Sequence, residues 1–176
     1  MSRTIILPQE IEDKLQALTS LKEESNGILL YRRQGDLCPI EALYMTGVGS
    51  PGHVQADPEK MEVANQFFKT HSDYRCVKFH THTKGTIAQF GEQYAREFSE
   101  KDIEGIQEQL HHDREFIAML VTPEKRLLSG IDNPQLHIVD HSEDYEKNHE
   151  FVETSLKGIA DDLEIGHERF RGTRLS

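Results

Sequence analysis

The segment "VKFHTHTKG", residues 77–85, places two histidines at the end of an apolar run of the kind that forms β-strands. Residues i and i+2 of a strand point to the same face, with Cα atoms about 6.6 Å apart at a rise of about 3.3 Å per residue. His80 and His82 therefore project together, and both imidazoles can converge on one metal ion. With ten histidines in the chain such a pair also arises by chance, so a metal site needs further ligands.

Strand-like and helical patterns alternate on both sides of this segment. Pro8 and Pro58 open predicted helices, and Ser99 opens another. Runs rich in branched and aromatic residues predict strands at 4–7, 27–31, 40–45, 76–82, 116–121, 127–130 and 136–139. A sheet covered by helices, of the α/β or α+β class, is therefore expected.

The composition limits the possible partners. With 176 residues the chain is expected to form one domain, 1–176. The 31 acidic and 20 basic residues give a net charge of -11, which argues against a nucleic acid or an anionic membrane as partner. No apolar run is long enough for a signal peptide or a membrane span, and Cys38 and Cys76 lack the spacing of metal ligands. A cytoplasmic protein with free thiols is expected.

The C-terminal extension, about 143–176, follows a predicted core of about 8–140 and is dominated by charge. Its apolar residues recur at helical spacing: Val152, Leu156, Ile159 and Leu163. One amphipathic helix is expected. Two interpretations of its apolar face stay open, because the face can dock on the core of the same chain or form a dimer or partner interface. A homodimer is therefore one option.

Two further patterns contain carboxylates at the edges of predicted elements. Downstream of the histidines, Ser99 and Asp102 form a Ser-x-x-Asp pattern at a predicted helix start, which is also the pattern of a helix cap. Upstream, Glu23 and Glu24 precede an apolar strand, where solvated glutamates are equally ordinary. Neither pattern decides the function alone.

Taken in order, the patterns are Glu-x-x-Gly opening a strand, His-x-His ending a strand and Ser-x-x-Asp opening a helix. Their residues are Glu24, Gly27, His80, His82, Ser99 and Asp102. In this combination the sequence resembles the JAMM metalloproteases of the MPN-domain family, zinc isopeptidases that include deubiquitinases and prokaryotic relatives. The resemblance covers about residues 8–140 and implies a mixed central sheet flanked by helices.

The resemblance implies a role for each polar residue. His80, His82 and Asp102 would hold Zn²⁺, which lowers the pKa of bound water toward about 7. Glu24 would act as the general base that takes the water proton and returns it to the leaving amine. Ser99 would donate a hydrogen bond to the oxyanion of the tetrahedral intermediate.

Sixteen residues, 83–98, separate His82 from Ser99, more than the family usually has. Within this segment Glu92 or Glu97 is an alternative to Asp102 as the third ligand. One helical stripe carries its apolar residues: Ile87, Phe90, Tyr94 and Phe98. The stripe is typical of core packing, and the functional alternative is a flap that clamps an extended substrate tail by strand addition.

The implied function is that of a zinc-dependent isopeptidase or peptidase that hydrolyses the bond after the C-terminus of ubiquitin or a ubiquitin-like modifier. Conjugates of such modifiers would be its partners. The alternative is a catalytically inactive MPN domain that serves as a scaffold subunit of a multiprotein assembly. Such domains normally lack one or more ligands, and this chain keeps the full set, so the sequence favours an enzyme.

Overall fold

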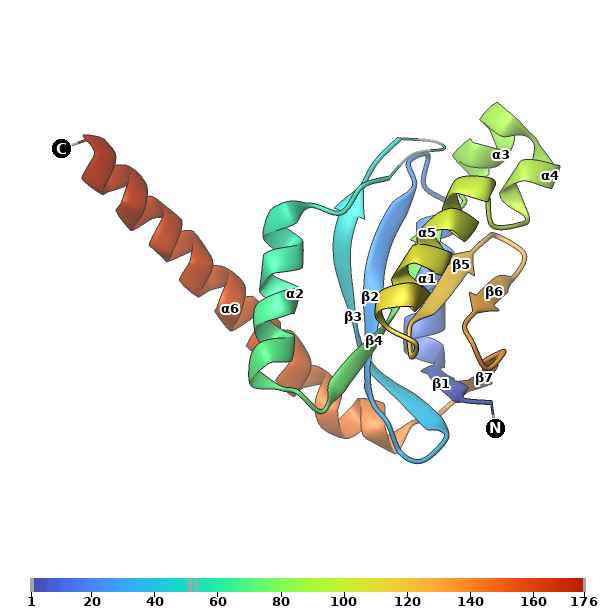
Figure 1. The fold of residues 1–176 in the computed structure, drawn as a ribbon, viewed down its shortest axis with the longest axis horizontal. Helices are drawn as coiled ribbons and strands as arrows, with labels where there is room; N and C mark the ends of the chain where they lie inside the picture. The colour runs from blue at the N-terminus through green and yellow to red at the C-terminus, as the bar shows by residue number, and fades with distance from the viewer. Residues whose placement is uncertain (1, 51, 53, 176) are drawn as a thin grey trace.

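A seven-stranded mixed sheet organises the described part of the chain (Figure 1). The structure is a computed structural model that describes the backbone of residues 2–50, 52 and 54–175, with side chains up to residue 164. The strands are β1 (Thr4–Pro8), β2 (Ser25–Arg32), β3 (Leu37–Val48), β4 (Tyr74–Thr81), β5 (Ile117–Val121), β6 (Arg126–Ser129) and β7 (Gln135–Val139). Their order in the sheet is β6-β5-β4-β2-β3-β1-β7. The expectation of a mixed sheet with helices is confirmed at this level.

Strands that are distant in sequence meet at the centre of the sheet. β2 lies between β3 and β4 and runs antiparallel to both. β4 pairs in parallel with β5, and β1 pairs in parallel with β3 and β7. β4, which carries the histidine pair, is therefore an inner strand with neighbours on both sides.

Helices cover both faces of this sheet and one of its ends (Figure 1). They are α1 (Gln9–Thr19), α2 (Pro58–Thr70), α3 (Lys84–Phe90), α4 (Glu92–Ala95), α5 (Glu100–His112) and α6 (Glu143–Leu175). The start of α2 follows the ordinary capping rule, since the Asp57 side chain accepts a hydrogen bond from the backbone amide of Glu59 and Pro58 follows at the first helical position. Pro8 is the N-cap residue of α1 and makes no side-chain cap. Within the described residues, no helix combines the length and the apolar character that crossing a membrane requires.

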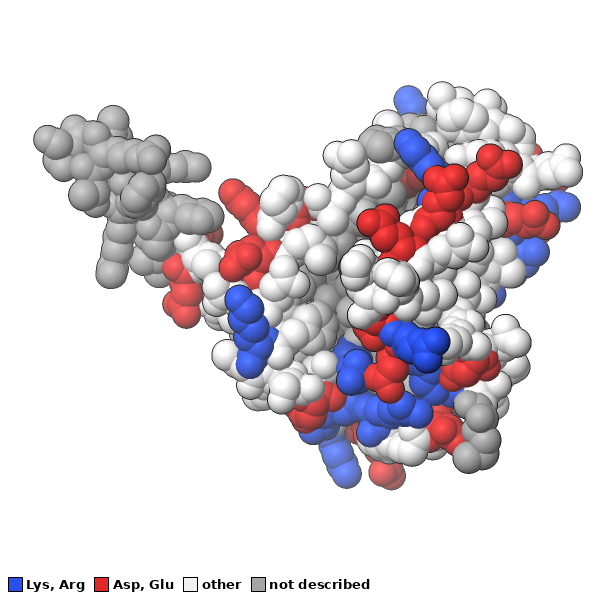
Figure 2. Space-filling view, in the orientation of Figure 1, with Lys and Arg blue, Asp and Glu red and all other residues white. Residues whose placement is uncertain are grey.

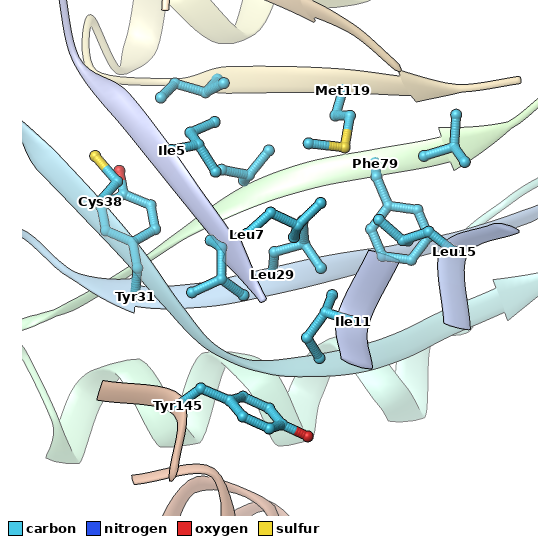
Figure 3. Close-up of a cluster of buried hydrophobic side chains, with 14 residues drawn as sticks. Ile5, Leu7, Ile11, Leu15, Leu29, Tyr31, Cys38, Phe79, Met119 and Tyr145 are labelled. Atoms are coloured by element: carbon cyan, nitrogen blue, oxygen red, sulfur yellow. The ribbon is translucent and has the colours of Figure 1, made fainter. Parts of the chain in front are cut away.

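One core lies between the sheet and α1 (Figure 3). Ile11 and Leu15, one helical turn apart on α1, are fully buried against Leu29, Phe79 and other strand residues. Complete burial of a side chain of this size contributes about 1.5–3 kcal/mol. This side of the sheet is sealed by apolar contacts.

A second core lies on the opposite face and includes the C-terminal helix. Val152 and Leu156 of α6 are buried beside Phe67 of α2 and Leu30 of β2. Ile159 and Leu163, the other members of the predicted apolar face, are partly buried against the same cluster. Of the two interpretations of this face, docking on the core of the same chain is confirmed for the described side chains.

The segment between the histidines and α5 differs from the prediction of one helical stripe. Gly91 has φ of 91°, a left-handed conformation that ends α3, and a separate short helix, α4, follows it. Phe90 and Tyr94 are 46% and 39% exposed, so the interpretation of the stripe as core packing is wrong for them. Residues 84–95 also contain no strand, and they offer no edge for the strand addition that a flap would require.

Candidate metal centre

The end of β4 places both histidines on one face of the sheet. His80 pairs with Asn26 of β2 and Leu120 of β5, which fixes its register. His82 lies one residue beyond β4, and its backbone amide still donates to the carbonyl of Val121 at 2.9 Å. The two imidazole centroids are 5.2 Å apart, and His82 is only 2% exposed. The predicted convergence of the two rings is therefore present.

Asp102 meets the histidines from the first turn of α5. Its Oδ2 atom lies 3.2 Å from His80 Nε2 and 3.8 Å from His82 Nε2. The same carboxylate accepts a hydrogen bond from the backbone amide of Ser99, whose hydroxyl oxygen in turn accepts from the amide of Asp102. The Ser-x-x-Asp pattern is thus a capping box, and this cap aims Asp102 at the histidines.

The three side chains fit a tetrahedral zinc ion. Their ligand atoms all lie within 4.8 Å of one another. Bonds of about 2.0–2.1 Å at tetrahedral angles would place such atoms about 3.3 Å apart. The distance from Asp102 to His80 is 3.2 Å, and the distance to His82 is longer, at 3.8 Å. Two imidazole nitrogens and a carboxylate oxygen also suit zinc chemically, and three protein ligands leave a fourth position for water.

The orientation of His82 is fixed by a partner outside this group. His82 Nδ1 lies 3.2 Å from the carbonyl oxygen of Ala95, at the end of α4. A carbonyl only accepts, so Nδ1 carries the proton and Nε2 keeps its lone pair toward Asp102. The Tyr94 ring stacks on the imidazole at a centroid distance of 5.6 Å. The inserted segment thus holds the imidazole of His82 in place.

The protonation states also favour a metal. Burial lowers the pKa of His82, and the neighbouring His80 lowers it further, so the neutral imidazole that metals require is favoured. Burial by itself raises the pKa of Asp102, but the hydrogen bond with His80 and those with Ser99 outweigh it and bring the value to about 2. Asp102 is therefore ionised at neutral pH.

Glu24 reaches the same place from the start of β2. It is 3% exposed and accepts a hydrogen bond of 2.9 Å from the Thr86 hydroxyl to its Oε1 atom. Gly27, three residues further along the chain, permits the close contact between β2 and β4, because a Cβ there would lie 2.6 Å from the Phe79 ring. Burial raises the pKa of Glu24, against the effect of Thr86, and so brings the carboxylate nearer to the range of a general base.

Ser99 combines its capping role with access to the same space. Its oxygen accepts the hydrogen bond from Asp102, and its O–H remains able to donate. The two alternative ligands lie elsewhere, since Glu92 is an exposed partner of Arg96 and Glu97 is exposed. Within the described residues, Asp102 is the acidic member of the group that could hold a metal ion.

Sequence reasoning missed the residues that support these groups. Thr86, Ala95 and Tyr94 contact Glu24 or His82 from the inserted segment. A local signal existed for Thr86 alone, because Thr83-x-x-Thr86 has the spacing of the capping box that opens α3. The contacts of Ala95 and Tyr94 depend on how α4 folds back, which no local pattern encodes.

The proposed site residues line one groove of about 990 Å³. Glu24, His80, His82, Ser99 and Asp102 all border it. It continues over the sheet between α5 and the start of α2, where the face in Figure 2 is hollowed. The groove is large enough for several residues of an extended peptide.

Comparisons with known proteins report a shared fold. No family model matches the chain, and no curated protein sequence matches it. Among solved structures, the chain is similar to protein DSY2949 from Desulfitobacterium hafniense, a structural genomics target studied in solution, with a TM-score of 0.54 and 20% sequence identity. The match covers 83% of this chain and 97% of that one. At this identity the likeness shows the fold alone.

Proposed function

We propose that this protein is a zinc-dependent isopeptidase or peptidase that cleaves the amide bond after the C-terminus of ubiquitin or a ubiquitin-like modifier. The observation that carries the proposal is the convergence of His80, His82 and Asp102 in a groove that also contains the buried Glu24. The order of these residues along the chain, which resembles that of the JAMM metalloproteases, supports the choice of reaction. The size of the groove, about 990 Å³, supports a polypeptide substrate.

The residues divide the reaction between them. Zinc held by His80, His82 and Asp102 would supply Lewis acidity and a water of lowered pKa. Glu24, with its own pKa raised by burial, accepts the proton of the attacking water and delivers it to the leaving amine. Ser99 donates its O–H to the oxygen that becomes negative, a contact worth about 2.7–4 kcal/mol where single donors have been removed.

The variant Glu24→Gln tests this assignment, because glutamine keeps the size of the side chain and cannot take the proton. Turnover of a modifier conjugate is expected to fall by about 10²–10⁴, while zinc content and folding stay unchanged. Mass spectrometry of modifier-linked peptides that accumulate with the variant identifies the substrate.

Glu23→Gln is the matched control, since Glu23 is exposed while its neighbour is buried. Its turnover should stay near that of the wild type. Equal rates for the two variants would remove Glu24 from the mechanism. A purified protein that holds no zinc would point to the scaffold alternative.

A further inference from the structure

Lys78 lies on the floor of the groove, two residues before His80 on β4. Alternate residues of a strand share a face, so Lys78 and His80 project on the same side of the sheet. The register places Ile28 of β2 and Ala118 of β5 on either side of Lys78. The small side chain of Ala118 leaves room for the lysine to extend along the groove.

The ammonium group of Lys78 has no ion-pair partner in the part of the chain that the structure describes. Other well-packed cations of the protein each have one, since Arg3 pairs with Asp132, and Arg126 pairs with Glu12 at 2.7 Å. The Nζ atom of Lys78 instead faces an aromatic ring, 6.0 Å from the centroid of Phe116. A half-buried cation without an anion is thus a particular feature of this groove.

The surroundings of Lys78 are largely apolar. Ile28, Ala118 and Phe116 line the groove from the strand side, and Ile106 lines it from α5. Gln109 of α5 adds one neutral polar group. A carboxylate that enters this part of the groove gains a charge-assisted hydrogen bond from the ammonium group of Lys78.

The spacing along β4 sets the distance from the reacting bond. Lys78 and His80 are two residues apart, or about 6.6 Å along the strand. An extended substrate that runs antiparallel to β4, with its scissile carbonyl at the group formed by His80, His82 and Asp102, therefore brings a group two residues after the cleaved bond to Lys78.

We propose that Lys78 forms a carboxylate-binding subsite of the groove, which selects substrates with a carboxylate about two residues from the cleaved bond. The role of this subsite in selecting substrates rests on the proposed function, whereas the binding of a carboxylate does not. Two sources offer the same chemistry: the free α-carboxylate of a two-residue leaving group, and the side chain of an aspartate or glutamate near the cleaved bond.

A binding measurement tests the subsite without turnover. N-acetyl-glycylglycine and its C-terminal amide are titrated into metal-free protein and followed by NMR chemical shifts, so that no carboxylate binds to zinc. The acid should bind about 10- to 100-fold more tightly than the amide, because a hydrogen bond between charged groups contributes that much to affinity. Lys78→Met and Lys78→Gln should both abolish this preference, while Lys69→Met, an exposed lysine of α2, should keep it. A preference that persists in both Lys78 variants, or none in the wild type, overturns the proposal.

A kinetic measurement with zinc-loaded protein separates the two sources. Three quenched fluorescent peptides share a ubiquitin-derived tail before the cleaved bond and differ after it: a two-residue acid, its amide, and an amide with glutamate as the second residue. A Lys78-dependent advantage in kcat/KM for the acid assigns the α-carboxylate, and one for the glutamate peptide assigns the side chain. If the wild type cleaves none of them while the binding preference holds, the proposed function fails and the subsite stands.

Discussion

Helices α1 and α5 lie against the same sheet and have similar lengths, 11 and 13 residues, yet they are held in opposite ways. α1 inserts Ile11 and Leu15 into a sealed core. α5 has no buried residue, covers a groove, and contributes Asp102 to the metal-binding group. The contrast teaches that α1 is fixed by apolar burial, whereas the position of α5 depends on polar contacts that a metal would complete.

The largest expected effect comes from removing His82, one of the proposed ligands on the side of the sheet that α5 covers. His82→Ala should abolish hydrolysis and weaken zinc binding by more than about 100-fold. Loss of a residue that only supports a metal ligand costs up to about 100-fold, and loss of a ligand itself should cost more. Zinc per protein is measured by inductively coupled plasma mass spectrometry beside the rate. His111→Ala, at the far end of α5, is the control and should keep both. Full zinc and turnover in His82→Ala would show that the metal centre is misassigned.

The next largest effect contrasts the two helices directly by unfolding in urea. Leu15→Ala removes a fully buried side chain and should lower the free energy of unfolding by about 2–5 kcal/mol. Ile103→Ala on α5 changes a side chain that is 46% exposed and should stay within about 0.5 kcal/mol. Similar losses for the two variants would mean that α5 is packed as firmly as α1.

The same contrast explains what the sequence predicts and what it does not. Strand-like runs predict all the strands of the described chain to within a few residues, because the inner faces of the sheet require branched and aromatic side chains. The capping pattern of Ser99 and Asp102 is local, and its position after His80 and His82 follows a known order. The sequence alone therefore indicates the five proposed site residues.

Other features depend on contacts between distant segments. The strand order places β2 beside β4, and this pairing alone brings Glu24 to the histidines. Gly91 splits the inserted segment, and the resulting fold of α4 supplies the carbonyl of Ala95 to His82. In the sequence Lys78 looks like an ordinary lysine, since its lack of an ion-pair partner among the described residues depends on how the groove is assembled.

Arg3 offers a second contrast with Lys78 of the groove, because Arg3 is a buried cation that forms an ion pair with Asp132. Its guanidinium donates to both carboxylate oxygens of Asp132, at 2.7 and 2.8 Å, and this pairing holds the pKa of Asp132 well below its usual range. Asp132→Asn should cost about 1.5–3 kcal/mol of unfolding free energy at neutral pH.

The pH dependence of this loss follows from the direction of the shift. A carboxylate whose pKa is depressed on folding stabilises the protein above its unfolded value of about 3.9 and loses that contribution as the pH falls through the folded value. The gap between wild type and Asp132→Asn should therefore be constant above about pH 5 and shrink as the pH falls toward about 2. Urea titrations across this range measure it, and a gap that widens in acid would contradict the assignment.

The smallest expected effect tests the metal dependence of α5 itself. If zinc completes the contacts of Asp102, amide hydrogen exchange in α5 should slow by about tenfold when zinc is added to metal-free protein, because ligand binding stabilises the docked helix. Exchange in α1 should not change, since Ile11 and Leu15 already hold that helix. Asp102→Asn should remove the effect on α5 while leaving α1 as in the wild type. If exchange slowed equally in both helices, zinc would stabilise the whole protein. That result would contradict the view that burial fixes α1 and a metal fixes α5.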